Sequence, residues 1–166
     1  MLYNRVFLVG FMCSGKSTVG RELAHTLGWE FVDVDEEIQR QENNTVAGIF
    51  QEKGEAYFRN LELQVLTQLS QRNRLVISTG GGLGANPVAM ELMKNKGLVV
   101  WLDIPFQEFL ERCKGDENRP LLKKSLEEIQ LIYQKRKEVY REAHLHLDAT
   151  KDVPSIVKEI VGFLNR

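Results

Sequence analysis

The chain has 166 residues, of which 43% are hydrophobic and 27% are charged, and its formal net charge at pH 7 is -1. A chain of this length suits one domain with a substantial core, so we expect a single domain over residues 1–166. The near-neutral charge disfavours a nucleic-acid-binding protein, which would need a basic face. The apolar run at residues 6–9 is too short for a signal segment or a membrane span, so we expect a cytoplasmic protein without a membrane partner.

The two cysteines, Cys13 and Cys113, are too few for a disulfide framework. Neither lies in a metal-ligand spacing such as C-x-x-C. Thiols stay reduced in the cytoplasm of most organisms, so we expect two free cysteines.

Short apolar runs alternate with longer amphipathic segments along the chain, which is the pattern of an α/β fold. We expect strands at residues 5–9, 30–34, 75–78, 98–102 and 145–149. The first four runs are dense in Val, Ile, Leu or Phe, as buried parallel strands are. In the fifth, apolar residues alternate with His146 and Asp148, so we expect His146 to face solvent.

Between these runs, apolar residues recur at the helical period, which predicts amphipathic helices with one face in the core. Two such stripes are Val19, Leu23 and Leu27, and Leu61, Val65, Leu66 and Leu69. A capping box formed by Ser125 and Glu128 opens a long helix. The apolar stripe of that helix is Leu126, Ile129, Tyr133 and Tyr140. The last helix is expected to begin near Pro154, because proline suits a first helical turn.

Residues 10–17, GFMCSGKS, match the phosphate-loop pattern G-x-x-x-x-G-K-[ST] in full. The match follows a predicted strand and precedes a predicted helix, which is the context that the pattern requires. The glycines let backbone N–H groups curl round a phosphate, and the helix N-terminus adds partial positive charge. Lys16 is expected to reach the β- and γ-phosphates, and Ser17 is expected to hold a metal ion. The motif predicts nucleotide binding, and the alternative is an accidental glycine turn.

Two features of common nucleotide-binding proteins are missing. A GTPase is disfavoured because Asn95 and Lys96 are followed by Gly97 and Leu98, not by the x-Asp that completes a guanine-binding motif. The aspartate that usually ends a second apolar strand is also missing, since the strand at 75–78 runs into Thr79 and glycines. An acidic residue for the metal must therefore come from elsewhere.

Asp33 and Asp35, at the end of the predicted strand 30–34, are the candidates. At positions i and i+2 of a strand, their side chains would project from one face. One carboxylate could hold a water of Mg²⁺, and the other could orient or deprotonate an attacking hydroxyl. The alternative is that Asp35 only caps a helix over residues 35–40.

Three consecutive glycines, residues 80–82, follow the predicted strand 75–78. They would let a substrate lie against bare backbone and meet its N–H donors. On a predicted helix, Arg59 and Glu62 are spaced i, i+3, so an ion pair could fix the guanidinium for the capture of a carboxylate. The alternative for this pair is a solvated position on the surface.

Residues 115–122, GDENRPLL, have the composition of a mobile lid, which we expect at about residues 113–124. Pro120 disfavours helical geometry at Arg119. An arginine that a lid delivers can stabilise the charge of a transferring phosphate, so Arg119 is a candidate catalytic residue.

Five motifs stand in order along the chain: the phosphate loop at 10–18, D-V-D at 33–35, F-R-N-L-E at 58–62, G-G-G at 80–82 and R-P-L-L at 119–122. With them the chain resembles the shikimate kinases over nearly its whole length. The resemblance implies a nucleoside-monophosphate-kinase-like P-loop fold of three layers, α/β/α, with a parallel five-stranded sheet, a lid and a substrate-binding helical region. It also implies transfer of the γ-phosphate of MgATP to the 3-hydroxyl of shikimate, in aromatic amino-acid biosynthesis.

The resemblance further implies the residues that bind the nucleotide. The ATP phosphates would be bound by Cys13, Ser14, Gly15, Lys16, Ser17 and Thr18, with Arg119 from the lid. Ser17 would ligate Mg²⁺, with Asp33 behind a water. Arg112 would flank the adenine, and Pro154 is a plausible second wall. The segment 150–153 stays unassigned, because Asp152 stands where a basic contact is expected.

The acceptor site follows from the same resemblance. Shikimate would be contacted by Asp35, Arg59, Gly81, Gly82 and Arg136, with Asp35 as base or positioner of the hydroxyl. Glu62 would steady Arg59, and Phe50 and Phe58 would wall the pocket. Arg136 lies in KRKEVY, residues 135–140, and the alternative for this charged segment is a solvated helix face.

Three other classes of protein are weighed against this prediction. Gluconate-type sugar-acid kinases and nucleoside-monophosphate kinases share the fold and the reaction class, but F-R-x-x-E with three glycines favours shikimate. A regulatory module that has lost catalysis would tolerate the loss of Lys16, Asp35 or Arg119, and all three are present. A nucleic-acid-binding P-loop protein is disfavoured by the charge. We therefore expect a monomer with ATP and shikimate as its small-molecule partners.

Overall fold

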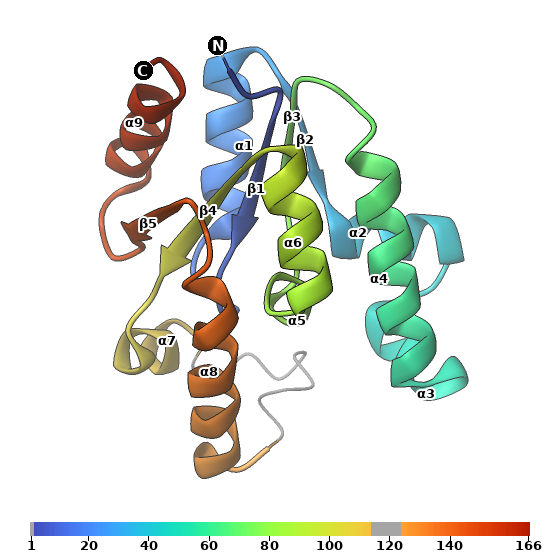
Figure 1. Ribbon diagram of the computed structural model, residues 1–166. Coiled ribbons are helices and arrows are strands. Elements are labelled where there is room, and N and C mark those ends of the chain that lie inside the picture. Colours follow the sequence, from blue (N-terminus) through green and yellow to red (C-terminus); the bar gives the residue numbers. More distant parts are fainter. Residues whose placement is uncertain (1, 114–123) are drawn as a thin grey trace.

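The computed structural model describes residues 2–113 and 124–166. A parallel sheet forms the middle layer, in the order β2-β3-β1-β4-β5. Helices lie on both of its faces (Figure 1). Helices α1 and α9 pack on each other on one face, and on the other α6 contacts both α4 and α8. The expected three-layer α/β fold with five parallel strands is confirmed.

The strands lie where the apolar runs predicted them, to within one residue at each end. They are β1 (Arg5–Val9), β2 (Glu30–Asp33), β3 (Leu75–Ser78), β4 (Leu98–Asp103) and β5 (Leu145–Asp148). The residues of β3 are all buried, as are those of β1 and β4 apart from Arg5 and Asp103. Strand β2 is only partly buried, because it forms an edge of the sheet and has the acidic residues Glu30 and Asp33 at its ends. His146 on the other edge strand is exposed, as predicted.

The helices begin and end at recognisable signals. They are α1 (Lys16–Leu27), α2 (Val34–Glu42), α3 (Val46–Lys53), α4 (Glu55–Leu69), α5 (Gly81–Gly84), α6 (Pro87–Lys96), α7 (Phe106–Arg112), α8 (Leu126–Tyr140) and α9 (Val153–Leu164). Ser125 caps α8 by accepting a hydrogen bond from the backbone N–H of Glu128, as the capping box predicted. Leu126 does not belong to the buried stripe of α8, because it lies in the first turn with 56% of its surface exposed.

The predicted geometry of the aspartate pair needs a correction. Strand β2 ends at Asp33, and Asp35 lies in the first turn of α2, so the two carboxylates are not on one face of a strand. The helix cap is Asp33, whose Oδ1 accepts from the backbone N–H of Glu36 at 3.1 Å. The hypothesis that Asp35 serves only as the cap of this helix is therefore wrong.

The expectation of two free cysteines is also wrong, because Cys13 and Cys113 form a disulfide. They are 100 residues apart in sequence, and their Cα atoms are 6.1 Å apart. Cys13 follows β1, and Cys113 ends the helix that follows β4. Strands β1 and β4 are parallel neighbours, so the segments after their carboxyl ends meet at one edge of the sheet. Sequence spacing alone cannot reveal this proximity.

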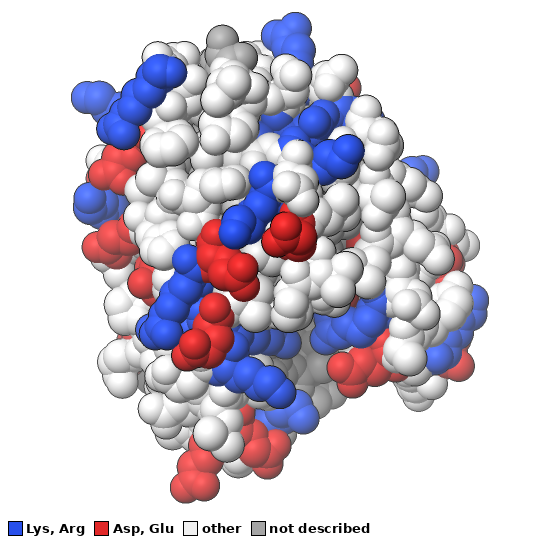
Figure 2. Space-filling view, in the orientation of Figure 1, with Lys and Arg blue, Asp and Glu red and all other residues white. Residues whose placement is uncertain are grey.

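The surface is mixed in charge. On the face shown in Figure 2, Lys and Arg side chains are interspersed with Asp and Glu side chains. In the described ranges 2–113 and 124–166, no helix is both long and apolar enough to span a bilayer.

Candidate active site

A cavity of about 700 Å³ lies at the carboxyl ends of the strands, where ligands bind in open parallel sheets. Nearly all the predicted site residues that the structure describes line it: Cys13, Ser14, Gly15, Lys16, Ser17, Thr18, Asp33, Asp35, Arg59, Gly81, Gly82, Arg112 and Arg136. Pro154, the suggested second wall for the adenine, is not among the lining residues. Phe50, Phe58 and Glu62 line it too. The predicted lid residue Arg119 lies outside the described residues, as does most of the predicted lid.

The phosphate loop connects β1 to α1, as its motif predicted. Lys16 begins α1, and its Nζ donates to the backbone oxygens of Gly10 at 2.7 Å and Phe11 at 3.0 Å. The lysine is 9% exposed, so its charge lies inside the curl of the loop. Its ammonium group is placed beside the backbone that would surround a phosphate.

Ser17 and Asp33 meet across the floor of the cavity. The Ser17 hydroxyl donates to Asp33 Oδ2 at 2.9 Å, which joins the first turn of α1 to the end of β2. No group of three or more His, Cys, Asp or Glu side chains in the described part of the chain could hold a metal ion by itself. The pair does fit Mg²⁺, which usually keeps several waters and takes one or two protein oxygens together with substrate phosphates.

On α4, Arg59 and Glu62 form the ion pair that their spacing predicted, with Arg59 Nη1 2.7 Å from Glu62 Oε1. The Glu62 side chain is 2% exposed, so the pair is not a solvated surface pair. Burial raises the pKa of Glu62 to about 7, Arg59 lowers it, and the charge of nearby Asp35 raises it further. The Arg59 guanidinium also lies 5.5 Å from the ring of Phe58 and 5.8 Å from that of Phe50.

The last two of the three glycines begin one turn of helix, α5, which spans residues 81–84, and Gly80 is its N-cap. Because glycine has no side chain, Gly81 and Gly82 leave space for the guanidinium groups of Arg136 and Arg59. A Cβ atom on Gly82 would lie 2.6 Å from Nη1 of Arg59, and one on Gly81 would lie 2.9 Å from Nη1 of Arg136. The glycine backbone therefore gives room to two guanidinium groups at once.

Arg136 reaches the cavity from α8. Of the charged residues at 135–138, it alone lines the cavity, while Lys135 and Glu138 are exposed. Its guanidinium lies 5.7 Å from the ring of Phe11. Burial lowers its pKa, and the electrostatic interaction with neighbouring Tyr140 partly offsets that effect. The solvated-face alternative does not describe this residue.

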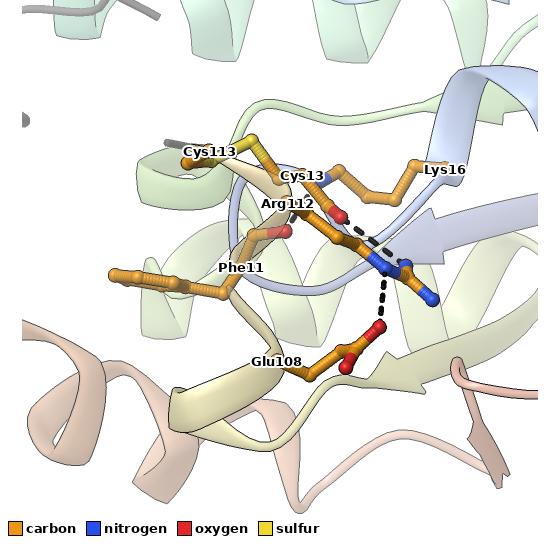
Figure 3. The surroundings of a disulfide bond; sticks show 6 residues. All are labelled: Phe11, Cys13, Lys16, Glu108, Arg112 and Cys113. Atoms are coloured by element: carbon orange, nitrogen blue, oxygen red, sulfur yellow. Dashed lines mark hydrogen bonds and ion pairs between the residues drawn. A yellow bond between two sulfur atoms is a disulfide. The ribbon is translucent and has the colours of Figure 1, made fainter. Parts of the chain in front are cut away.

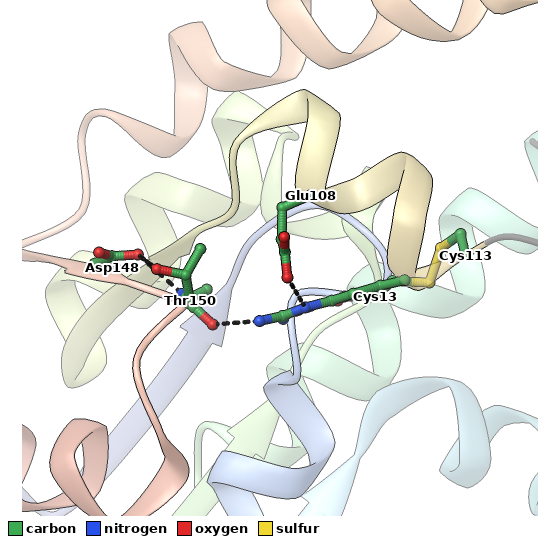
Figure 4. Close-up of polar contacts among 7 residues, drawn as sticks. Cys13, Glu108, Cys113, Asp148 and Thr150 are labelled. Carbon is green, nitrogen blue, oxygen red and sulfur yellow. Dashed lines mark hydrogen bonds and ion pairs between the residues drawn. A yellow bond between two sulfur atoms is a disulfide. The ribbon is translucent and has the colours of Figure 1, made fainter.

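Arg112 connects the phosphate loop to the turn after β5. It donates to the Cys13 oxygen at 3.3 Å and to the Ala149 oxygen at 2.8 Å, and Glu108 lies on its other side (Figures 3 and 4). Cys13 has a φ of 62°, a left-handed conformation that costs a non-glycine residue about 1 kcal/mol or more. The disulfide and the contact with Arg112 hold the loop in this conformation.

Sequence patterns missed four of the residues that line the cavity, Glu36, Val46, Ser78 and Thr79. Met12 and Gly80 also line it and lie inside the predicted motifs, although no role was assigned to them singly. Val46 and Phe50 are spaced i, i+4 on α3, and this spacing after the Thr45 cap was a usable signal for the helix. The hydrogen bond from the buried Tyr140 hydroxyl to the Gly81 oxygen, beneath the cavity, could not be predicted from the sequence.

Comparisons with known proteins agree with this geometry. The family model for shikimate kinase matches residues 12–165. The shikimate kinase of Aquifex aeolicus (strain VF5) is 51% identical over 157 residues, which are 95% of this chain and 94% of that protein.

Two solved structures have the same fold over nearly the whole chain. The crystal structure of Aquifex aeolicus shikimate kinase matches with a TM-score of 0.87 at 46% identity, and the match covers 97% of this chain and 96% of that one. Shikimate kinase from Acinetobacter baumannii, in complex with shikimate, matches with a TM-score of 0.92 at 36% identity over 98% and 93% of the two chains. With the family model and these relatives in agreement, this chain belongs to the shikimate kinase family, whose members phosphorylate shikimate with ATP.

Proposed function

We propose that this protein transfers the γ-phosphate of ATP to the 3-hydroxyl of shikimate, with its donor and acceptor sites in the one cavity described above. The observation that carries the proposal is the placement of Arg59 and Arg136 against Gly82 and Gly81, in the cavity that the phosphate loop and Asp35 also line. Two guanidiniums suit an acceptor that carries a carboxylate, and a carboxylate suits its hydroxyls. Shikimate has both groups.

At the donor end, the loop from Cys13 to Thr18 binds the ATP phosphates through its backbone N–H groups. Lys16, which already lies in the curl of the loop, exchanges a backbone oxygen for a phosphate oxygen and neutralises charge on the β- and γ-phosphates. Arg112, the last residue of α7, flanks the adenine from its position between the Cys13 and Ala149 backbone oxygens. These residues hold the leaving group in place while the bond to the γ-phosphorus breaks.

Mg²⁺ is the proposed cofactor, and it neutralises charge on the β- and γ-phosphate oxygens when bound. Ser17 would supply the hydroxyl ligand, and Asp33 would hold a water of the metal. The 2.9 Å hydrogen bond between these two side chains supports this assignment, because it keeps both oxygens at one point of the cavity. Asp33 stays oriented through its second oxygen, which caps α2.

At the acceptor end, Arg59 and Arg136 bind the carboxylate, and the backbone of Gly81 and Gly82 lies against the substrate. Glu62 orients Arg59 through their buried ion pair. Phe50 and Phe58, whose ring centroids are 4.8 Å apart, wall the pocket.

Asp35 accepts a hydrogen bond from the attacking hydroxyl of shikimate. As the oxygen–phosphorus bond forms and the bond to ADP breaks, the hydroxyl proton leaves toward this carboxylate. The transition state of phosphoryl transfer is loose, so positioning of the hydroxyl supplies a large part of this residue's effect.

The remaining assignments are predictions. Arg119 is expected to bring its charge to the transferring phosphate from a lid at about residues 113–124, inside a single domain of residues 1–166. We also expect a monomeric, cytoplasmic enzyme without nucleic-acid or membrane partners. The mixed charge in Figure 2 supports the first of these exclusions. Size-exclusion chromatography with light scattering tests the monomer.

The experiment that tests the function is ADP release by the purified protein with MgATP and, in separate reactions, shikimate, gluconate, AMP, CMP or no acceptor. We expect strong turnover with shikimate alone. Turnover with another acceptor would support kinase activity but contradict the acceptor site proposed here. If no acceptor gives ADP release although calorimetry shows that ATP binds, the result would favour a regulatory binding module.

A further inference from the structure

Tyr140 lies directly beneath the acceptor end of the cavity, although it does not line it. It ends α8, and it is 0% exposed. Its ring lies 6.0 Å from that of Trp101 in β4, and its hydroxyl donates to the backbone oxygen of Gly81 at 2.7 Å. A buried tyrosine hydroxyl needs a hydrogen-bond partner, and the Gly81 oxygen provides it.

Arg136, one helical turn earlier on α8, lies against the same glycine. A Cβ atom on Gly81 would stand 2.9 Å from Arg136 Nη1 and 3.5 Å from the Tyr140 hydroxyl. The hydroxyl proton is committed to the Gly81 oxygen. One buried hydroxyl therefore ties the end of α8 to the glycine turn against which Arg136 Nη1 lies.

If this turn were free to move, the long arginine side chain that lies against it would have several rotamers open to it. The ring of Phe11, 5.7 Å away, attracts the charge but does not fix the direction of the N–H groups. Burial raises the pKa of Tyr140 far above its usual range, so the hydroxyl stays neutral and keeps its proton. The hydroxyl therefore donates to the Gly81 oxygen over the whole working pH range.

We propose that Tyr140 is a positioning residue for the acceptor, because its hydroxyl holds the Gly81 backbone, against which the Arg136 guanidinium lies, in the orientation that receives the substrate carboxylate. The proposal rests on the role assigned to Arg136 above. It adds that half of the carboxylate site is organised before substrate binds. Preorganisation of this kind reduces the conformational entropy that is lost when the acceptor binds, and it involves no contact with the phosphate that is transferred.

The test is Tyr140→Phe, which removes one oxygen and keeps the ring. We expect KM for shikimate to rise about tenfold, the size of effect that loss of one buried hydrogen bond gives. The kcat and the KM for ATP should stay within about twofold, since uniform binding of the acceptor is what is lost.

Tyr133→Phe is the matched control. Tyr133 lies on the same helix, is 4% exposed, and donates to the Ile104 oxygen at 2.7 Å. The Tyr133→Phe variant loses the same kind of buried hydrogen bond, but Tyr133 does not hold the glycine turn beside Arg136. An equal rise in KM for both variants, at equal loss of thermal stability, would mean that Tyr140 serves the fold only and would overturn the proposal.

A double-mutant comparison with Arg136 distinguishes failure of this proposal from failure of the proposed function on which it rests. Arg136→Met should raise KM for shikimate by itself, and adding Tyr140→Phe should raise it no further. If Arg136→Met has no effect, the carboxylate role of Arg136 fails. If it has an effect but Tyr140→Phe has none, only the role of Tyr140 fails.

A measurement on the unmodified protein keeps the test independent of how the variants fold. Side-chain ¹⁵N relaxation should show an ordered Arg136 Nε before shikimate is added. A freely rotating guanidinium that becomes ordered only with shikimate would contradict the proposal.

Discussion

Arg59 lies so close to Gly82 that a Cβ atom on this glycine would stand 2.6 Å from Nη1 of the arginine. The clash is with the end of a flexible side chain, so Gly82→Ala should displace the guanidinium and leave the fold intact. We expect kcat/KM for shikimate to fall about tenfold to a hundredfold, because small displacements of a substrate-positioning group are costly. Steady-state kinetics with both substrates measures this, and KM for ATP should not change.

Gly162→Ala is the control for that variant. Gly162 lies in α9, and a Cβ atom added to it would meet nothing within 4 Å. Alanine there should leave kinetics unchanged and stabilise the helix by roughly 0.5–1 kcal/mol. Normal shikimate kinetics in Gly82→Ala would remove the arginine from the acceptor site.

Glu62 should make stability depend on pH. Its pKa rises from 4.5 in the unfolded chain to about 7 in the fold, so the folded state binds the proton more tightly. Between these two values, the free energy of unfolding contributed by this group decreases as pH rises, by about 3 kcal/mol in total. Urea unfolding at pH 4.5 to 8 should show this slope in the wild type and lose it in Glu62→Gln.

Glu55→Gln is the comparison for Glu62→Gln. Glu55 faces the same arginine at 3.6 Å but is 69% exposed. The Glu55→Gln variant should show the same dependence of the free energy of unfolding on pH as the wild type. An unchanged slope in Glu62→Gln would show that burial of this carboxyl does not shift its titration.

The disulfide should contribute to stability by limiting the unfolded chain. It closes a loop with a sequence separation of 100 residues, for which chain entropy predicts about 4–5 kcal/mol and engineered cases give less. We expect reductant to lower the free energy of unfolding by about 2–5 kcal/mol. Cys113→Ser should have the lower value with or without reductant. Two reactive thiols in the denatured, unreduced protein would contradict the bond itself.

Asp35→Asn should lower kcat by about 10² to 10⁴, the usual range for loss of a group that takes or directs a proton. ATP affinity, measured by calorimetry, should be close to that of the wild type. Glu37→Gln, two residues along the first turn of α2 and paired with Arg40, serves as the control. Unchanged turnover in Asp35→Asn would remove this carboxylate from the mechanism.

The sequence predicted what depends on local pattern. Alternating or continuous apolar runs located all five strands, and the phosphate loop was located because its glycines and lysine are close together in the chain. Asp35 was assigned to the wrong element, since two residues at a strand end do not show where the strand stops and the helix begins. Helix α3 was missed because it is short: eight residues make about two turns, too few for a helical period to stand out.

Relationships between distant segments could not be predicted from local pattern. The order of the strands brings the loop after β1 beside the end of α7, and only this pairing makes the Cys13–Cys113 disulfide possible. In the same way, the need for glycine at 81 and 82 comes from arginines on α8 and α4, not from an unusual backbone conformation.

The most direct test of the central claim is ³¹P and ¹H NMR of the reaction of the protein with MgATP and shikimate. We predict one new phosphate monoester, coupled to the proton on carbon 3 of the ring and formed in a one-to-one ratio with ADP. ADP accompanied by inorganic phosphate, or an ester on another hydroxyl, would contradict the arrangement of Asp35, Arg59 and Arg136 proposed for this site.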